Sequence, residues 1–145
     1  MALASLFSGI ALANARLGAV HGFAGPLGGL TDAPHGAVCG ELLPCVMEAN
    51  VRALSERAPD SPALARFDEA ARILTGGNAA RAADGVSWVR DLCAAFGLPG
   101  LRTYGLSQEQ LPVVVAKARN ASSMKGNPVE LRDEELLDVL VNTMD

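Results

Sequence analysis

Segments rich in alanine and leucine fill this sequence, and glycine and proline separate one segment from the next. Both alanine and leucine lose little conformational freedom in an α-helix, whereas aromatic residues, which favour strands, make up only 4% of the chain. No segment shows the strict apolar–polar alternation of a half-buried strand. At 145 residues the chain is long enough to bury one core. The sequence therefore predicts a single all-α domain over residues 1–145, a bundle of five to seven helices.

Capping and helix-breaking residues predict where the helices begin and end. Proline suits the first turn of a helix, glycine suits the position after its last residue, and Ser107 with Gln110 matches a capping box. The expected helices cover approximately residues 2–20, 34–54, 62–75, a segment within 78–96, 107–120 and 133–144.

The first expected helix, over residues 2–20, is apolar around most of its circumference. A helix of this kind is typical of the centre of a bundle, and small residues along this one would let a neighbour approach closely. The glycines after it predict that it ends near His21, with the Gly25-Pro26 pair closing the turn.

The charge balance and the cysteines limit which binding partners and which cellular compartment we expect for this protein. Acidic residues outnumber basic ones by 16 to 12, and no basic cluster is present that would neutralise a run of phosphates, so we expect no nucleic-acid partner. Cys39, Cys45 and Cys93 are odd in number and follow no Cys-x-x-Cys spacing, which indicates free thiols in a reducing compartment. The expected location is the cytoplasm.

The N-terminal stretch MALASLFSGIALANA has the apolar core and the small-residue ending of a signal peptide. No lysine or arginine precedes its apolar run, however, and we do not expect export. Asn14, Arg16 and His21 interrupt the stretch before it reaches the roughly 20 apolar residues that a bilayer requires, so no membrane span is expected either.

The only two histidines, His21 and His35, lie fourteen positions apart on either side of a loop rich in glycine and proline. The loop can fold one helix end against the start of the next, which would place the nearest ring nitrogens within about 7 Å of each other, suitable for iron or zinc. Spacing alone favours the simpler interpretation, two unrelated histidines that are each hydrogen-bonded to a carbonyl. Cys39, one helical turn after His35, is either a third ligand or, more simply, a small buried residue.

The segment LGAVHGFAGPLGG…DAPHGAVCGELLP resembles the metal-site signature of the iron-containing alcohol dehydrogenase family. In that family one helix ends in a Gly-x-x-His-Gly turn and the next opens with Pro-His-Gly. The similarity extends to ALASLFSGIALANARLG before the signature, to MEAN after it, and to the chain end SSMKGNPVELRDEELLDVLVNTMD. It covers essentially all 145 residues, and it implies the C-terminal helical part of such an enzyme.

This resemblance implies a divalent metal, ferrous iron or zinc, which one aspartate and three histidines bind in the family. His21 and His35 match two of those ligands, and Gly22, Gly28, Gly29 and Gly36 would keep bulk away from the metal. It also implies an upstream domain that holds NAD or NADP. Two departures stand out: Gly25 occupies a position where many members carry another histidine, and no Gly-x-Gly-x-x-G turn occurs in these 145 residues.

The expected function is therefore the metal-site part of an NAD(P)-dependent dehydrogenase that interconverts a small alcohol and its aldehyde. With two imidazoles alone, we expect the isolated chain to bind metal weakly and to show no NAD(P)-linked turnover, and no catalytic or cofactor-binding residue is expected within it. The alternative is a non-catalytic helical module that forms a homo-oligomer or binds a separately encoded nucleotide-binding half.

Overall fold

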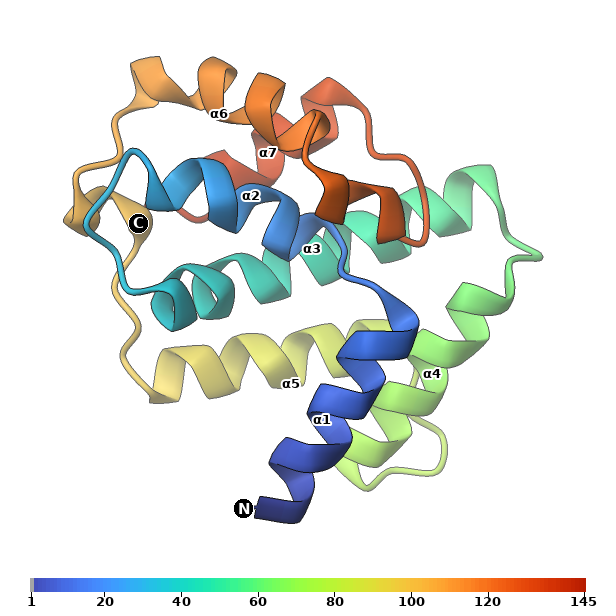
Figure 1. Cartoon of the computed structure of the whole chain (residues 1–145). Coiled ribbons are helices and arrows are strands. Elements are labelled where there is room, and N and C mark those ends of the chain that lie inside the picture. The colour runs from blue at the N-terminus through green and yellow to red at the C-terminus, as the bar shows by residue number, and fades with distance from the viewer. Residues whose placement is uncertain (1) are drawn as a thin grey trace.

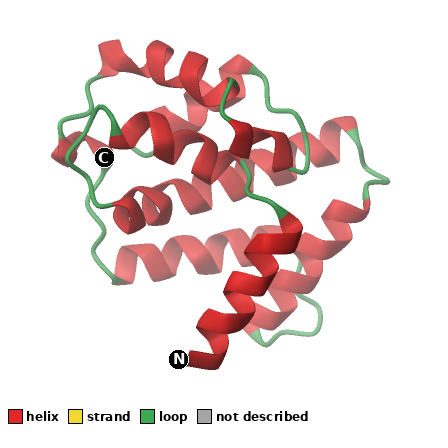
Figure 2. Cartoon of the chain, in the orientation of Figure 1, coloured by secondary structure: helices red, strands yellow, loops and turns green. Residues whose placement is uncertain are grey.

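The computed structural model describes residues 2–145 as seven α-helices and three short 3₁₀ helices (Figure 1). The α-helices are α1 (Ala2–Ala15), α2 (Ala19–Gly28), α3 (His35–Arg57), α4 (Pro62–Thr75), α5 (Ala82–Ala95), α6 (Leu111–Arg119) and α7 (Asp133–Val141). The 3₁₀ helices are η1 (Leu101–Tyr104), η2 (Gln108–Gln110) and η3 (Ser122–Gly126). Residues 2–145 contain no strand (Figure 2), so the all-α prediction is confirmed, as is the expected number of helices.

The helices after α1 stack on one another around a common core. α2 packs between α6 and α3, α5 packs on α3, α4 packs against α5, and α7 contacts both α6 and α3 (Figure 1). Phe23 and Leu27 of α2 and Leu42 of α3 are fully buried in this core. The central helix of the bundle is therefore α2, the helix that carries His21.

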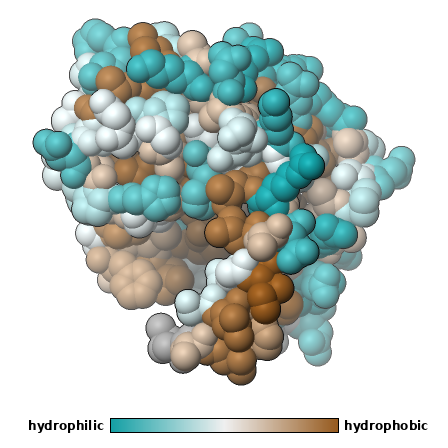
Figure 3. All heavy atoms as spheres, viewed as in Figure 1, coloured by the Kyte–Doolittle hydropathy of each residue, from teal (hydrophilic) through white to brown (hydrophobic). Residues whose placement is uncertain are grey.

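The prediction of one central helix over residues 2–20 is wrong. The helix stops at Ala15, Arg16 takes a left-handed backbone conformation (φ 65°), and α2 starts at Ala19 at 98° to α1. Every residue of α1 is exposed, with Phe7 at 60% (Figure 3). The break has a physical cause, because the side chain of Asn127 accepts a hydrogen bond from the Ala19 N–H and so caps a new helix there.

Most of the other predicted helix ends are confirmed. Ser61 caps α4 by accepting from the Ala63 N–H, and Gly76 (φ 72°) and Gly97 (φ 63°) take the left-handed conformation that ends a helix. The capping box is present in one direction, since the Ser107 N–H donates to Gln110 Oε1. The box encloses the 3₁₀ helix η2, and α6 begins directly after it at Leu111. Pro26 lies inside α2 instead of ending a helix.

Among the described residues, no single helix is long and apolar enough to cross a membrane. Only the bent pair of α1 and α2, taken together, has the length and apolar composition that a membrane span would need.

One ion pair joins the end of α3 to the start of α7. Arg57 donates to both carboxylate oxygens of Glu135, at 2.6 and 3.0 Å, and also to the Glu130 carbonyl. The Glu135 carboxylate in addition accepts from the Arg132 N–H and so caps α7. The hydrogen bond from Arg57 is the main reason that the pKa of Glu135 lies below its usual value.

We expect Glu135→Gln to lower the free energy of unfolding by about 1 kcal/mol at pH 7, since the amide can still cap α7 but cannot form the ion pair. A depressed pKa stabilises the fold above the ordinary carboxyl pKa, and this contribution is lost as the pH falls below about 4. Urea unfolding at pH 7 and pH 3.5 should therefore show the difference between wild type and variant shrinking in acid. Glu134→Gln, at the exposed neighbouring position, is the control; a difference that persists unchanged in acid would contradict the prediction.

Candidate metal centre

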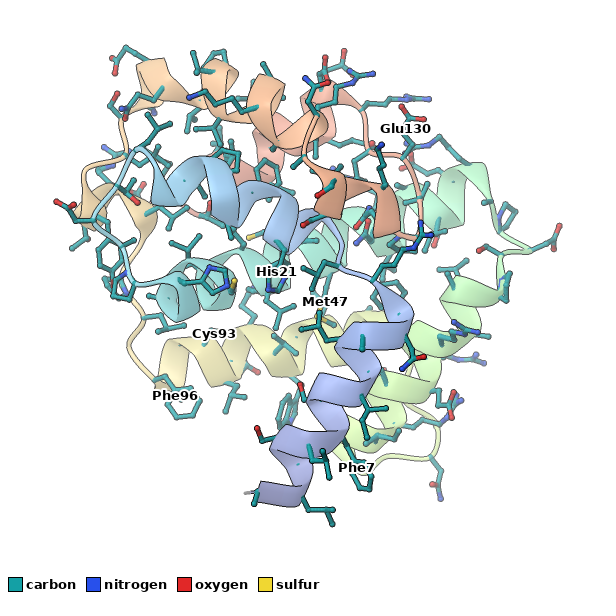
Figure 4. The ribbon with its side chains drawn as sticks, viewed as in Figure 1. Phe7, His21, Met47, Cys93, Phe96 and Glu130 are labelled. Carbon is teal, nitrogen blue, oxygen red and sulfur yellow. The ribbon has the colours of Figure 1, made fainter. Side chains whose placement is uncertain are left out.

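His21 lies in the first turn of α2, three residues after Gly18. The sequence predicted it at the C-terminal end of the first helix, and that placement is wrong because the helix restarts at Ala19. Its side chain is half-buried, and it lies near the centre of the molecule, on the α3 side of α2 (Figure 4).

His35 is the first residue of α3, directly after Pro34, as the sequence predicted. Pro34 has an extended backbone (φ −58°, ψ 136°), and the chain turns into the helix immediately afterwards. The His35 side chain is exposed. Both histidines therefore lie in first turns of helices, and the short segment from Gly29 to Pro34 returns the chain from the end of α2 to the start of α3.

The two imidazoles lie next to each other. Their ring centroids are 5.4 Å apart and their planes are inclined at 53°. One nitrogen of each ring and the Cys39 sulfur all lie within 4.8 Å of one another. The predicted proximity of the two rings is thus confirmed, and the three donors, two nitrogens and one sulfur, are of the kinds that bind zinc and iron.

Cys39 is the residue of this cluster for which the sequence left two roles open. Its Sγ is 3.5 Å from His35 Nε2 and 4.0 Å from His21 Nε2. The thiol is half-buried, and burial raises its pKa above the ordinary value. Without a cation beside it the thiol is therefore protonated at neutral pH. A bound divalent ion reverses this preference, because a coordinated thiol loses its proton.

A largely apolar cleft of about 490 Å³ opens beside this cluster. His21 and Cys39 form part of its wall, and Met47 of α3 lies nearby (Figure 4). The remaining lining comes mainly from the α1–α2 junction, α3, and the end of η3 with the residues after it, and α4 contributes Phe67. These lining residues include Val20, Leu43, Val46, Asn50, Gly126 and Pro128. The space is of the size that small-molecule sites have, and its polar groups are few.

Asn127 is a positioning residue whose long-range role the sequence analysis did not identify. Its Oδ1 accepts from the Ala19 N–H (3.1 Å) and from Asn50 Nδ2 (3.2 Å), while its Nδ2 donates to Asn50 Oδ1 (2.6 Å) and to the Val129 carbonyl (2.8 Å). One side chain thus ties the start of α2 to α3 and to the segment before α7. The only local sequence signal is the Asn-Pro pair, which indicates a turn and gives no distant partner.

Two glycines near the α1–α2 junction and Asn127 lie where other parts of the chain come close to them. A Cβ on Gly126 would lie 1.9 Å from the Leu17 carbonyl oxygen, so no side chain fits there. A Cβ on Gly22 would meet the flexible end of Met124 at 2.8 Å. Gly28 and Gly36 have open space around them, so the expectation that such glycines are required to keep bulk away from a metal has no support at these two positions.

Comparison with known proteins identifies what this helical domain is similar to. Residues 1–144 match the family model for the C-terminal part of the Fe-containing alcohol dehydrogenase family. The chain is 35% identical to 1,3-propanediol dehydrogenase of Citrobacter freundii over 141 residues, which are 96% of this chain and 35% of that protein. It is 32% identical to lactaldehyde reductase of Escherichia coli K12, again over 96% of this chain and 36% of that protein.

Solved structures show the same relationship in three dimensions. A crystal structure of a 1,3-propanediol oxidoreductase superposes with a TM-score of 0.82 at 28% identity, and the match covers 97% of this chain and 36% of that one. An alcohol dehydrogenase from Oenococcus oeni superposes with a TM-score of 0.76 at 31% identity, with 93% of this chain and 34% of that one covered. This chain therefore spans about a third of the length of the proteins it matches.

Proposed function

Because this chain belongs to the iron-containing alcohol dehydrogenase family, we propose that it forms the metal-site part of an NAD(P)-dependent enzyme that interconverts a small alcohol and its aldehyde. The observation that carries the proposal is the pairing of His21 with His35, whose rings lie 5.4 Å apart, with His21 in the wall of an apolar cleft. The family resemblance implies these two residues as metal ligands, and their proximity in the structure supports that assignment.

The two histidines and the cleft have different tasks in this proposal. His21 and His35 bind a ferrous or zinc ion, which when bound supplies Lewis acidity toward the oxygen of an alcohol. Leu43, Val46 and Met47 give the cleft an apolar wall against which a short alkyl chain can pack, and they exclude water from the space beside the donors. His21 is half-buried in the first turn of α2, which restricts its ring. The exposed His35 extends toward the same metal position from the first turn of α3.

Further parts of the activity depend on more protein than these 145 residues. The relatives are almost three times as long as the matched region, which is 35% of the Citrobacter freundii protein. We propose that a nucleotide-binding portion, in the same or a separate polypeptide, holds NAD or NADP and completes the metal site with further ligands. Its substrate is a small alcohol or aldehyde, in keeping with the diol and aldehyde in the names of the relatives.

α1 offers the surface at which that portion would join. Leu3, Leu6, Phe7 and Ile10 are each more than half exposed, and together they form an apolar ridge along this helix (Figure 3). Apolar surface of this extent is typical of a face that packs against protein. The same ridge favours a second candidate function, a helical module without catalytic activity that associates with its own copies.

We further propose that the protein functions in the cytoplasm and without a nucleic-acid partner. Cys39, Cys45 and Cys93 are all free thiols within the described part of the chain, which fits a reducing compartment. The net charge of −4 does not favour binding to phosphate backbones.

A chimeric enzyme tests the proposed function. The segment of the Citrobacter freundii 1,3-propanediol dehydrogenase that matches this chain is replaced by residues 1–145, and the purified protein is assayed with 1,3-propanediol and NAD or NADP in the presence of ferrous iron or zinc. We expect nicotinamide reduction roughly a thousandfold or more above that of a chimera carrying Ala at both histidine positions, because only the former can hold the Lewis acid.

The chimera must first be shown to be folded, by circular dichroism and a cooperative thermal transition. A folded chimera that binds neither metal nor alcohol, together with a stable dimer of the 145-residue chain in light scattering, would support the oligomerising module instead. Equal turnover in the chimera and in its variant with Ala at both histidine positions would contradict the metal-site role.

A further inference from the structure

We propose that Cys39 is a metal ligand, so that this chain binds zinc through three donors of its own: His21, His35 and Cys39. The inference rests on the proposed function, because it uses the same histidine pair, and it adds a sulfur donor to the two histidines that this chain supplies. Cys39 is one helical turn after His35 on α3, which brings both side chains onto the face that meets the first turn of α2.

The distances fit a tetrahedral ion. With metal–sulfur and metal–nitrogen bonds of about 2.3 and 2.1 Å, tetrahedral angles separate a sulfur from a nitrogen ligand by about 3.6 Å. The Cys39 sulfur lies 3.5 Å from His35 Nε2 and 4.0 Å from His21 Nε2, on either side of that value. All three donor atoms lie within 4.8 Å of one another, and rotations of both the His21 and the His35 side chains would close the set around one ion.

The other two cysteines show that this arrangement is particular to Cys39. Cys45 donates to the Asn142 carbonyl and Cys93 to the Gly40 carbonyl, as ordinary partly buried thiols do. Cys39 has two imidazole nitrogens as its neighbours instead. Three donors also leave a fourth tetrahedral position for water, for substrate or for a ligand from the remaining portion of the enzyme, which is the form that catalytic zinc sites take.

The donor set determines which metal is bound. A thiolate with two imidazoles is a borderline-soft set that favours zinc or cobalt over magnesium and manganese, which prefer oxygen ligands. On binding, the thiol proton passes to the buffer and the sulfur binds as thiolate. The single-turn spacing of His35 and Cys39 makes α3 the main source of ligands, with α2 contributing one.

The test uses the 145-residue chain with zinc or cobalt added, in the presence of a phosphine reductant. X-ray absorption at the zinc edge should show a sulfur shell at about 2.3 Å in the wild type, and cobalt should give a sulfur-to-metal charge-transfer band. Cys39→Ala and Cys39→Ser should lose both signals and bind zinc about 10- to 100-fold more weakly. Cys45→Ala, which removes a thiol from the same helix, should retain both.

The outcomes separate this inference from the proposed function. Zinc bound by nitrogen and oxygen ligands alone in the wild type, no zinc binding at all, or a sulfur shell that survives Cys39→Ala would overturn the role of Cys39. Zinc affinity unaffected by His21→Ala and His35→Ala would instead contradict the histidine pair, and with it the proposed function.

Discussion

Replacing His35 by alanine in the chimeric enzyme should reduce kcat/KM for 1,3-propanediol oxidation by roughly a thousandfold or more. Lewis-acid stabilisation by a metal is worth several kcal/mol, and each 1.4 kcal/mol or so corresponds to a tenfold change in rate. The His35 side chain is exposed, so its removal leaves no cavity and no unpaired buried group. The loss should therefore appear in activity and metal content, and not in the thermal transition of the metal-free protein.

His21→Ala should give a similar loss of activity with an added cost in stability, because this side chain is half-buried between α2 and α3. Metal content by mass spectrometry and the thermal transition separate the two effects. Ser55→Ala is the matched control: it removes an exposed polar side chain from the same helix as His35, well along α3 from the cluster. A His35→Ala chimera that keeps both its metal and its turnover would contradict the assignment.

The histidine pair was predictable from sequence because its geometry is set locally. His21 and His35 are fourteen positions apart, and the chain between them holds only the rest of α2, which ends at Gly28, and a short return. Glycine and proline in that stretch restrict how it can turn. The predicted distance was therefore reached even though His21 begins its helix and does not end one.

The division of the first helix at Arg16 was not predictable by the same reasoning. The group that caps α2 is Asn127, which is 108 residues away along the chain, and no local pattern indicates that contact. Gly18 was a weak local signal, since glycine is among the residues found at the N-cap position that Gly18 occupies before α2. Tertiary contacts decided between one long helix and two, which propensity alone cannot do.

The prediction for α1 failed in a different way. Its apolar circumference led to the prediction of a buried central helix, but apolar character alone does not say whether another segment of the same chain covers a helix. In the described residues Phe7 and Ile10 remain more than half exposed, whereas Phe23 of α2, with the same apolar character, is fully buried. The difference lies in the neighbours: α2 packs between α3 and α6.

Replacing Asn127 by alanine should lower the free energy of unfolding by about 3 kcal/mol. The substitution leaves the Ala19 N–H and the amide of the buried Asn50 without their partners, and each orphaned group costs about 1–3 kcal/mol. Urea unfolding followed by circular dichroism measures the change as a shift of the midpoint at constant slope.

The same substitution should also weaken zinc binding by the chain, because the Ala19 N–H that Asn127 holds is two residues before His21, in the first turn of α2. Asn120→Ala is the control, since the Asn120 amide donates only to the Ala116 carbonyl one turn earlier on an exposed helix end, and its loss should cost no more than about 0.5 kcal/mol.

If Asn127→Ala and Asn120→Ala destabilise the fold equally, the side chain of Asn127 does not join α2 to α3. If Asn127→Ala lowers stability but leaves zinc affinity unchanged at temperatures where the variant is folded, the position of His21 is set by the packing of Phe23 and Leu27 in the core and not by the cap.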